Sequence, residues 1–369
     1  MNIDERIVDK HTLALLRKYG FDSIPFSELV RRLKTGSLST ESNRLEGPLE
    51  LPREEAYARL PEAGSEPARD LAAIGQAAID AGQVGAIVLN GGMATRFGGL
   101  AKGVTEAVAG RSFLDLKLHQ VARAGSGRVP VFLMNSFATE EPTRNYLAGM
   151  GAPCPVGSFP QMISMRCTPS GDLFFDRNGN PSLHAPGHGD LPFALQRSGV
   201  LEDFIARGGR WLTVSNVDNL GASLDPRIIG LHIAEGAQMT VEIVRATQND
   251  VGGFPAVVDG KMIIVEAFRA PGSFDLSTIP VFNTNTFVFD AHALLGTFDL
   301  DWFAAFKNVD GREAVQFERL VGQLTEFMTV TWLLVPRDGP HSRFIPIKVP
   351  ADLEYREKEL RQMISAQEA

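Results

Sequence analysis

The feature that most constrains the fold is an apolar run that ends in a glycine-rich loop. Residues 84–88 read VGAIV, and residues 89–103 read LNGGMATRFGGLAKG. A glycine-rich turn lets backbone N–H groups approach an anion closely, and the side chains of Arg96 and Lys102 can then neutralise its charge. The sequence therefore predicts a strand that leads into a phosphate-binding loop.

The spacing of the glycines excludes two common nucleotide-binding loops. Lys102 is not followed by Ser or Thr, so the GxxxxGK[ST] P-loop is not present. The next glycine after Gly91 and Gly92 is Gly98, which breaks the GxGxxG pattern of dinucleotide-binding proteins. For the loop taken alone, a simple strand-to-helix turn that needs glycine for steric reasons stays open as an alternative.

From residue 84 onwards, apolar runs alternate with helical patterns. A helix is predicted from Ser112, whose S-x-x-D start resembles a capping box, and another over residues 139–151. Strands are predicted in the segments 85–89, 129–137, 210–222, 239–246, 256–268, 280–290 and 329–336, with an Asp-Gly hairpin turn at Asp259 and Gly260. A short strand over 342–348 is expected to lead into a C-terminal helix. This alternation predicts an α/β fold with a largely parallel sheet wrapped by helices. Ligands of such sheets bind beyond the carboxyl ends of the strands.

The first part of the chain has a different texture. Residues 1–80 are helical and polar, with a clear helix over 67–82 that stops at Gly82 and a loop over 35–48. We therefore expect an N-terminal helical segment, residues 1–82, and a catalytic domain, residues 83–369.

Charge and cysteine content exclude several classes of protein. The net charge is −8, which argues against a nucleic-acid partner or an anionic membrane surface. The two cysteines form no disulfide framework and have no zinc-ligand spacing. The N-terminus shows no apolar leader, and the apolar segment 328–336 is too short to span a bilayer. A cytoplasmic protein is expected.

The loop resembles the nucleotide-binding signature of the sugar-1-phosphate nucleotidylyltransferases, and most of all that of the UDP-glucose pyrophosphorylase family (UTP:glucose-1-phosphate uridylyltransferases). The family form is roughly L-N-G-G-L-G-T-x-x-G followed by G-P-K; Ala94 and Ala101 replace a glycine and the proline. The resemblance implies a Rossmann-like, GT-A-like nucleotidyltransferase fold with a mixed, mostly parallel sheet. It implies nucleotide contacts from Leu89, Gly91, Gly92 and Thr95, and catalytic cations at Arg96 and Lys102.

Further matches follow in the order of the family. PGHGD, residues 186–190, implies that Gly187 contacts the nucleotide and His188 the sugar phosphate. A histidine between glycines has little to pack against, which disfavours a purely structural role for it. SFPQM implies that Gln161 reads the uracil edge, because an amide suits an edge with both a donor and an acceptor. LMNSF places Met134 at the border of the base.

The segment VSNVDNLGA, residues 214–222, is the strongest match. By resemblance, Asp218 is the ligand of Mg²⁺ and Asn216 contacts the sugar. A Mg²⁺ ion held by one carboxylate and by substrate phosphates needs few protein ligands. An Asx-turn at the end of the strand is the alternative, most plausible for Asn219.

The remaining matches concern the hexose and a second lysine. FNTNTFVF implies hexose contacts from Phe282 and Asn283, VEAF from Glu266, and DVGGFP, which lacks the family's lysine, from Gly252. SRFIPIK makes Lys348 the second active-site lysine. Without the resemblance, Glu266 and Lys348 would be taken for exposed charges at strand ends.

The implied reaction joins UTP and glucose-1-phosphate to UDP-glucose and pyrophosphate with Mg²⁺. The attacking phosphate is already ionised, which agrees with the absence of a Ser/His/Asp or paired-carboxylate motif. Two alternatives stay open: another sugar-1-phosphate, galactose or an N-acetylhexosamine, and a sugar-nucleotide-binding regulator without turnover. His188 speaks against the N-acetyl sugar, since relatives that use it tend to have G-N-G-G there, and glycine spacing excludes a dinucleotide-dependent oxidoreductase. The chain is expected to lack the C-terminal β-helical domain of eukaryotic members, and its oligomeric state is left open.

Overall fold

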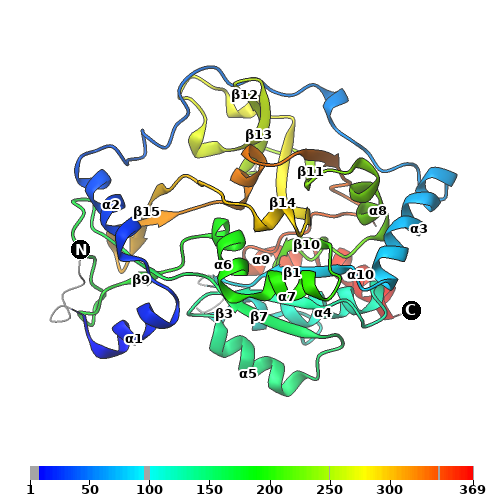
Figure 1. Cartoon of the computed structure of the whole chain (residues 1–369), viewed down its shortest axis with the longest axis horizontal. Helices are drawn as coiled ribbons and strands as arrows, with labels where there is room; N and C mark the ends of the chain where they lie inside the picture. The colour runs from blue at the N-terminus through cyan, green and yellow to red at the C-terminus, as the bar shows by residue number, and fades with distance from the viewer. Residues whose placement is uncertain (1–7, 95–99, 249, 340, 369) are drawn as a thin grey trace.

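A seven-stranded sheet lies at the centre of the molecule (Figure 1). The computed structural model describes residues 8–94, 100–248, 250–339 and 341–368. The strand order is β17-β11-β14-β10-β1-β6-β7, and all strands are parallel except β14, which runs against both its neighbours. The bounds are β1 Val84–Leu89, β6 Val131–Asn135, β7 Val156–Pro160, β10 Trp211–Asn216, β11 Met239–Arg245, β14 Val281–Asp290 and β17 Val330–Leu334. This arrangement confirms the predicted mixed, mostly parallel α/β fold.

Strand β1 shows why the apolar run forms the middle of the sheet. All six of its residues are buried. Val84, Ala86 and Val88 face one hydrophobic cluster, while Ile87 and Leu89 face another on the opposite side of the sheet. A strand that is buried on both faces requires apolar residues at every position, which is what a parallel sheet covered by helices demands.

Helices cover both faces of the sheet. Side chains of α3 and α4 share one cluster with β1 and β6, and side chains of α6 and α7 share the other. Helix α4 begins after Ser112, whose Oγ accepts a hydrogen bond from the N–H of Asp115 at 3.0 Å, and α5 ends at Gly151 with a left-handed conformation. The bounds are α1 Lys10–Lys18, α2 Ser23–Lys34, α3 Glu66–Asp80, α4 Phe113–Ala124, α5 Glu140–Met150, α6 Leu191–Ser198, α7 Val200–Ala206, α8 Pro226–Glu235, α9 Pro350–Tyr355 and α10 Glu357–Glu368.

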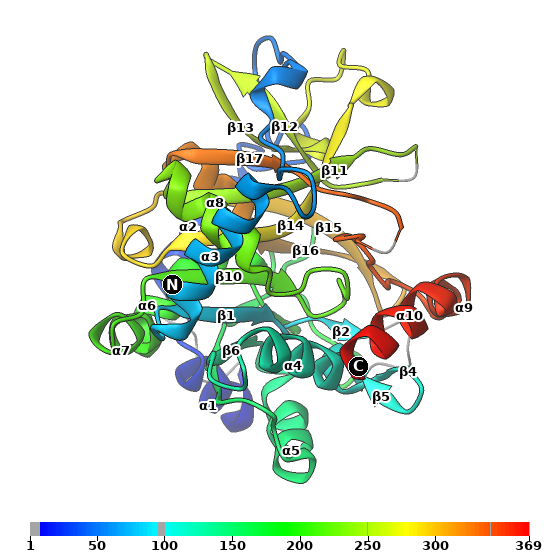
Figure 2. The same cartoon turned by 90° about the vertical axis from the view of Figure 1, so that its right-hand side faces the viewer.

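Small hairpins project from this core. The pair β12 Gly253–Val258 and β13 Lys261–Glu266 stands at the top of Figure 2, and its turn residues Asp259 and Gly260 have φ of 50° and 78°. These values confirm the predicted two-residue Asp-Gly turn. The other pairs are β2 Met93–Ala94 with β3 Leu100–Ala101, β4 Glu106–Val108 with β5 Arg111–Ser112, β8 Ser164–Met165 with β9 Leu183–His184, and β15 Phe303–Val309 with β16 Arg312–Glu318.

The N-terminal helices lie at opposite sides of the molecule (Figure 1). Helices α1 and α2 pack in a cluster with β16, and α3 packs against α8. The approach of α3 to α8 is close because Gly75 and Gly230 place bare backbone at the contact; an added Cβ would overlap the backbone of Pro226 or Leu71. Residues 35–48 contain no helix or strand, as expected. None of the helices in the described part of the chain has the length and apolar character needed to cross a membrane.

The parallel strands of the sheet all end at one edge, where the antiparallel β14 begins. The carboxyl ends of β1, β6, β7 and β10 lie there together with the amino end of the antiparallel β14. The segments that follow these ends carry most of the residues predicted to bind substrate, so the topology places them side by side.

Candidate active site

The glycine-rich loop is anchored from below by Asn90. This side chain is fully buried, and its Nδ2 donates to Asn135 Oδ1 at 2.8 Å and to Thr143 Oγ1 at 2.9 Å. Gly103 packs directly on the Asn90 amide, in a space that would not admit a Cβ. The loop is therefore fixed at both its start and its end by one buried amide.

Three residues predicted to contact the nucleotide converge above this anchor. The Gln161 side chain, which follows β7, lies against the backbone of Gly91 so closely that a Cβ on Gly91 would overlap it. Gln161 Nε2 donates to the carbonyl of Gly187 at 2.9 Å. The amide of Gln161 thus joins the glycine-rich loop to the segment that carries His188.

The other residues that were predicted to contact the nucleotide do not lie together. Leu89 and Met134 are buried in the core of the sheet, with exposed fractions of 7% and 1%, and Gly92 is exposed. The Met134 side chain is packed in the core cluster below the loop. Thr95 and Arg96 lie outside the described residues.

Lys102 and Asp218 form an ion pair at the edge of the sheet. The Nζ of Lys102 lies 2.6 Å from Asp218 Oδ2, and both side chains are partly exposed, at 12% and 21%. Lys102 follows β3 and Asp218 follows β10, so two loops that are far apart in sequence supply the pair. A strand-end turn would explain Asp218 alone, but it would not bring the lysine of the glycine-rich loop to it.

Lys348 reaches the same place through a segment that runs beside Asp218. The Ile347 N–H donates to the Asp218 carbonyl at 3.0 Å, and Leu220 N donates to the Ile345 carbonyl at 3.2 Å. The predicted strand over 342–348 is wrong as a regular strand, because only Asn219 and Pro346 form an isolated bridge there. The predicted C-terminal helix is also divided in two, into α9 and α10.

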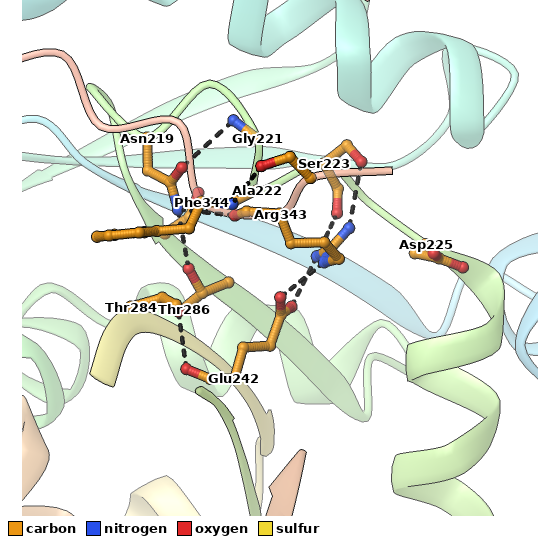
Figure 3. Close-up of polar contacts among 12 residues, drawn as sticks. Asn219, Gly221, Ala222, Ser223, Asp225, Glu242, Thr284, Thr286, Arg343 and Phe344 are labelled. Carbon is orange, nitrogen blue, oxygen red and sulfur yellow. Dashed lines mark hydrogen bonds and ion pairs between the residues drawn. The ribbon is translucent and has the colours of Figure 1, made fainter. Parts of the chain in front are cut away.

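Asn219 explains why this segment is held without a sheet. Its Oδ1 accepts from the N–H groups of Ile345 and Gly221 at 2.9 and 3.3 Å, and its Nδ2 donates to the Arg343 carbonyl at 3.2 Å (Figure 3). The side chain is 1% exposed. The Asx-turn reading of Asn219 is confirmed in part, since it bonds Gly221, but most of its bonds join two distant segments.

A cleft of about 230 Å³ collects the predicted sugar-phosphate residues. Its wall contains all six of them together with the predicted metal ligand and the second lysine: His188, Asn216, Gly252, Glu266, Phe282, Asn283, Asp218 and Lys348. The structure therefore brings together residues that the sequence spreads over 161 positions, from 188 to 348.

His188 faces this cleft in a neutral form. Its Nδ1 accepts a hydrogen bond from the Val321 N–H at 3.0 Å, so the proton of the neutral ring resides on Nε2. Burial lowers the pKa of His188 to about 4, which keeps the ring uncharged at neutral pH. His188 can therefore donate one hydrogen bond but supplies no charge.

Glu266 lies beside a pair of glycines in the wall of the same cleft. A Cβ on Gly253 would stand 2.8 Å from Glu266 Oε1, so the carboxyl group is packed against bare backbone. Burial raises the pKa of Glu266 to about 7, although Arg269 opposes that change. At neutral pH this group is present both as an acid and as a carboxylate, and it can hydrogen-bond to hydroxyl groups in either form.

Three asparagines that also line the cleft are joined by hydrogen bonds. Asn285 Nδ2 donates to Asn216 Oδ1 at 2.9 Å, and the Asn285 N–H donates to Asn283 Oδ1 at 3.0 Å. Asn285 has a φ of 56°, and the register of β14 against β11 shifts next to it. The bulge directs the Asn285 side chain towards Asn216.

A set of buried charges below these loops was not predicted from the sequence: Lys117, Glu242 and Arg343 are all buried. Burial, and then the positive charge of Arg343, lower the pKa of Lys117 to about 7. The signal was present in the sequence, since Lys117 stands between Leu116 and Leu118 and Glu242 stands inside an apolar strand pattern. A charge at a position that must be buried indicates a specific partner.

The residues at Asp218 fit a magnesium ion. Within the described part of the chain, Asp218 uses Oδ2 for Lys102, and Oδ1 makes no hydrogen bond to protein. Among these residues no cluster of three or more His, Cys, Asp or Glu side chains could enclose a metal. One accessible carboxylate oxygen next to a phosphate-binding loop is the donor set that Mg²⁺ uses when substrate phosphates complete its shell.

Comparisons with known proteins agree with this geometry. A family model described as UTP–glucose-1-phosphate uridylyltransferase matches residues 54–365. A curated relative from Dictyostelium discoideum, UTP–glucose-1-phosphate uridylyltransferase 2, is 31% identical over 74% of this chain and 58% of its own length. The Saccharomyces cerevisiae UTP–glucose-1-phosphate uridylyltransferase is 32% identical over 72% of this chain and 57% of its own length. The chain thus spans less than two thirds of the length of these relatives.

Solved structures support the fold. A Trypanosoma brucei structure described as UDP-glucose phosphorylase has a TM-score of 0.73 at 25% identity, covering 92% of this chain and 77% of that chain. A Trypanosoma brucei uridine diphosphate N-acetylglucosamine pyrophosphorylase has a TM-score of 0.75 at 19% identity, covering 94% of this chain and 79% of that chain. The second likeness concerns the fold alone.

Proposed function

Because the chain belongs to the UTP–glucose-1-phosphate uridylyltransferase family, we propose that it transfers the uridylyl group of UTP to glucose-1-phosphate, giving UDP-glucose and pyrophosphate. The observation that carries this proposal is that Asp218 and Lys348 line one cleft, and that Lys102 is ion-paired to Asp218. The three residues come from three separate segments, and the rest of the cleft wall combines polar side chains, two glycines and apolar side chains such as that of Phe282.

In this reaction a phosphate oxygen of glucose-1-phosphate attacks the α-phosphorus of UTP. The bond from that phosphorus to the bridging oxygen of the β-phosphate breaks, and pyrophosphate leaves with the electron pair. The attacking oxygen is ionised at neutral pH, so the chain needs no general base, which fits the neutral His188. The task of the protein is to bring two polyanions together and to stabilise the charge of the transition state.

Each part of the site has a place in this scheme. The backbone of Gly91 and Gly92 would hold the nucleotide phosphates, with Gln161 next to the base. Lys102 and Lys348 would supply positive charge at the transferred phosphate, as would Arg96, which lies outside the described residues. The six cleft residues predicted for the sugar phosphate would hold the hexose by hydrogen bonds and apolar contact.

Magnesium dependence is part of the proposal. Asp218 would hold the ion, which when bound neutralises phosphate charge and polarises the phosphorus under attack. A cytoplasmic location belongs to the proposal as well, supported by the two buried cysteines, neither of which is in a disulfide. We also propose the division into an N-terminal helical segment, 1–82, and a nucleotidyltransferase domain, 83–369.

Pyrophosphate release from UTP and glucose-1-phosphate tests the proposal. We expect release only when both substrates and Mg²⁺ are present, with reactions lacking the sugar phosphate or the metal as controls. Galactose-1-phosphate and N-acetylglucosamine-1-phosphate, measured in parallel, are expected to react more slowly. If pyrophosphate release were faster with either of these two sugar phosphates, that sugar phosphate would be the substrate in place of glucose-1-phosphate. UTP or UDP-glucose binding without release from any sugar phosphate would identify a regulator and overturn the enzymatic proposal.

A further inference from the structure

A buried ion pair lies directly below the two segments that carry Asp218 and Lys348. Arg343 donates from Nε to Glu242 Oε2 and from Nη2 to Glu242 Oε1, both at 2.6 Å (Figure 3). The Glu242 side chain is 2% exposed and that of Arg343 is 8% exposed. Glu242 belongs to β11 in the sheet, whereas Arg343 precedes the Lys348 segment.

A gain in the stability of the fold does not by itself explain a buried ion pair such as Arg343–Glu242. Removing two charges from water costs free energy that their attraction repays only in part, and a pair of apolar residues of similar volume is often as stable or more stable. The arrangement of the pair therefore calls for another explanation, which its remaining hydrogen bonds provide.

The guanidinium group of Arg343 also holds the segment that follows Asp218. Its Nη2 donates to the Ser223 carbonyl at 3.0 Å, and its Nη1 lies 3.3 Å from Ser223 Oγ. The two segments touch so closely that a Cβ on Gly221 would lie 2.7 Å from the carbonyl carbon of Arg343. One side chain thus ties the Asp218 segment and the Lys348 segment to a strand of the central sheet.

Lys117 supports the same segment independently of Arg343. It reaches up from α4, and its Nζ donates to the Ala222 carbonyl at 2.6 Å and to Ser215 Oγ at 3.2 Å. The carbonyls of Ala222 and Ser223, four and five positions after Asp218, therefore both accept hydrogen bonds from buried basic side chains.

We propose that Arg343, oriented by Glu242, is a positioning residue that sets Lys348 and Asp218 at their working separation. This inference rests on the proposed uridylyl transfer. Arg343 touches no substrate in this scheme; it acts through the two segments. Loosening the pair would misplace charge needed in the transition state, so kcat falls while the KM values for UTP and glucose-1-phosphate change little.

The test uses the full chain and separates position from stability. Arg343→Met alone leaves a buried carboxylate and is expected to lower the melting temperature. The double variant Glu242→Leu/Arg343→Met removes both charges and is expected to regain most of that loss. We nevertheless expect its kcat to stay about 10²-fold low, with KM for each substrate within threefold of the wild type, as about 1 Å of misplacement would cause.

Two further variants keep the inference open to refutation. Glu242→Gln keeps the side-chain volume and one acceptor, so it is expected to fold and to lower kcat by about tenfold, which corresponds to about 1.4 kcal/mol. The control is Glu54→Gln/Arg245→Met, which removes an exposed Arg–Glu pair at the end of the same strand and is expected to leave kcat unchanged. Wild-type kcat in the double variant, or in Glu242→Gln should the double variant not fold, would overturn the positioning role. An inactive wild-type protein in the same assay would overturn the proposed function, and the inference with it.

Discussion

The residues proposed to bind the phosphates and those proposed to bind the hexose, called here the phosphate end and the hexose end of the site, solve different chemical problems with different groups. At the phosphate end, Lys102 and Asp218 are partly exposed and held as an ion pair 2.6 Å apart. At the hexose end, burial moves the pKa of both titratable groups towards the neutral form, to about 4 for His188 and about 7 for Glu266. One end thus presents charge, and the other presents hydrogen-bonding groups with little charge.

This contrast follows from what each end would bind. Phosphates are charged throughout the proposed transfer, so fixed cations in a partly dry site stabilise them strongly. Sugar hydroxyls are neutral, and a neutral donor such as His188 Nε2–H binds them without attracting a competing phosphate. The comparison implies that substitutions at the phosphate end change kcat most, while those at the hexose end change substrate preference.

The largest effect is expected from Lys102→Ala. Loss of one positioned cation should lower kcat for pyrophosphate release by about 10²–10³-fold, by analogy with the removal of one preorganised donor. Lys102 is partly exposed, so the fold should stay intact, as the far-ultraviolet circular dichroism spectrum and melting temperature would show. Lys307→Ala, an exposed lysine on β15, is the matched control. A near-normal rate of pyrophosphate release in Lys102→Ala would contradict the proposed role of Lys102 at the phosphate end.

A smaller and more selective effect is expected from Glu266→Ala. Loss of a hydrogen bond from a charged or half-charged group to the hexose should raise the KM for glucose-1-phosphate by about ten- to a hundredfold. The KM for UTP should change by less than threefold, because Glu266 is proposed to bind the hexose and not the nucleotide. Steady-state kinetics with each substrate varied in turn would measure both values. An equal rise in both KM values would contradict the division of the site into two ends.

Local patterns predicted a large part of this molecule. The continuous apolar run of β1, the serine cap of α4 and the Asp-Gly turn after β12 are each decided by a few neighbouring residues, and all three form as expected. The cleft residues were found because their motifs match a family, and the strand order then explains why they meet.

The features that local patterns did not predict depend on contacts between segments that are distant in the sequence. The segment 343–348 was predicted to form a strand, but most of its backbone hydrogen bonds go to the loop after β10, and it joins no sheet among the described residues. The role of Lys117 depends on where α4 lies below Ala222, which no local pattern states. The packing of Glu266 against Gly253 depends on the pairing of β12 with β13.

The smallest expected effect concerns the pH dependence of stability at the hexose end. The pKa of Glu266 rises from its ordinary 4.5 to about 7 on folding, so the folded chain binds this proton more tightly than the unfolded chain. The stability that protonated Glu266 contributes is therefore complete below about pH 4.5 and is lost as the pH rises through about 7. Glu266→Gln, which stays neutral, should not lose it.

Melting temperatures of the wild type and of Glu266→Gln, measured from pH 5 to pH 8, would test this direction of the pH dependence. We expect the variant to gain a few degrees relative to the wild type as the pH rises. His188 gives the opposite trend, because its pKa falls on folding and its contribution is lost below about pH 6.5; it is the same in both proteins and cancels in the difference. If the difference in melting temperature between the two proteins stays constant with pH, the carboxyl group of Glu266 is solvated. The hexose end would then not favour neutral groups.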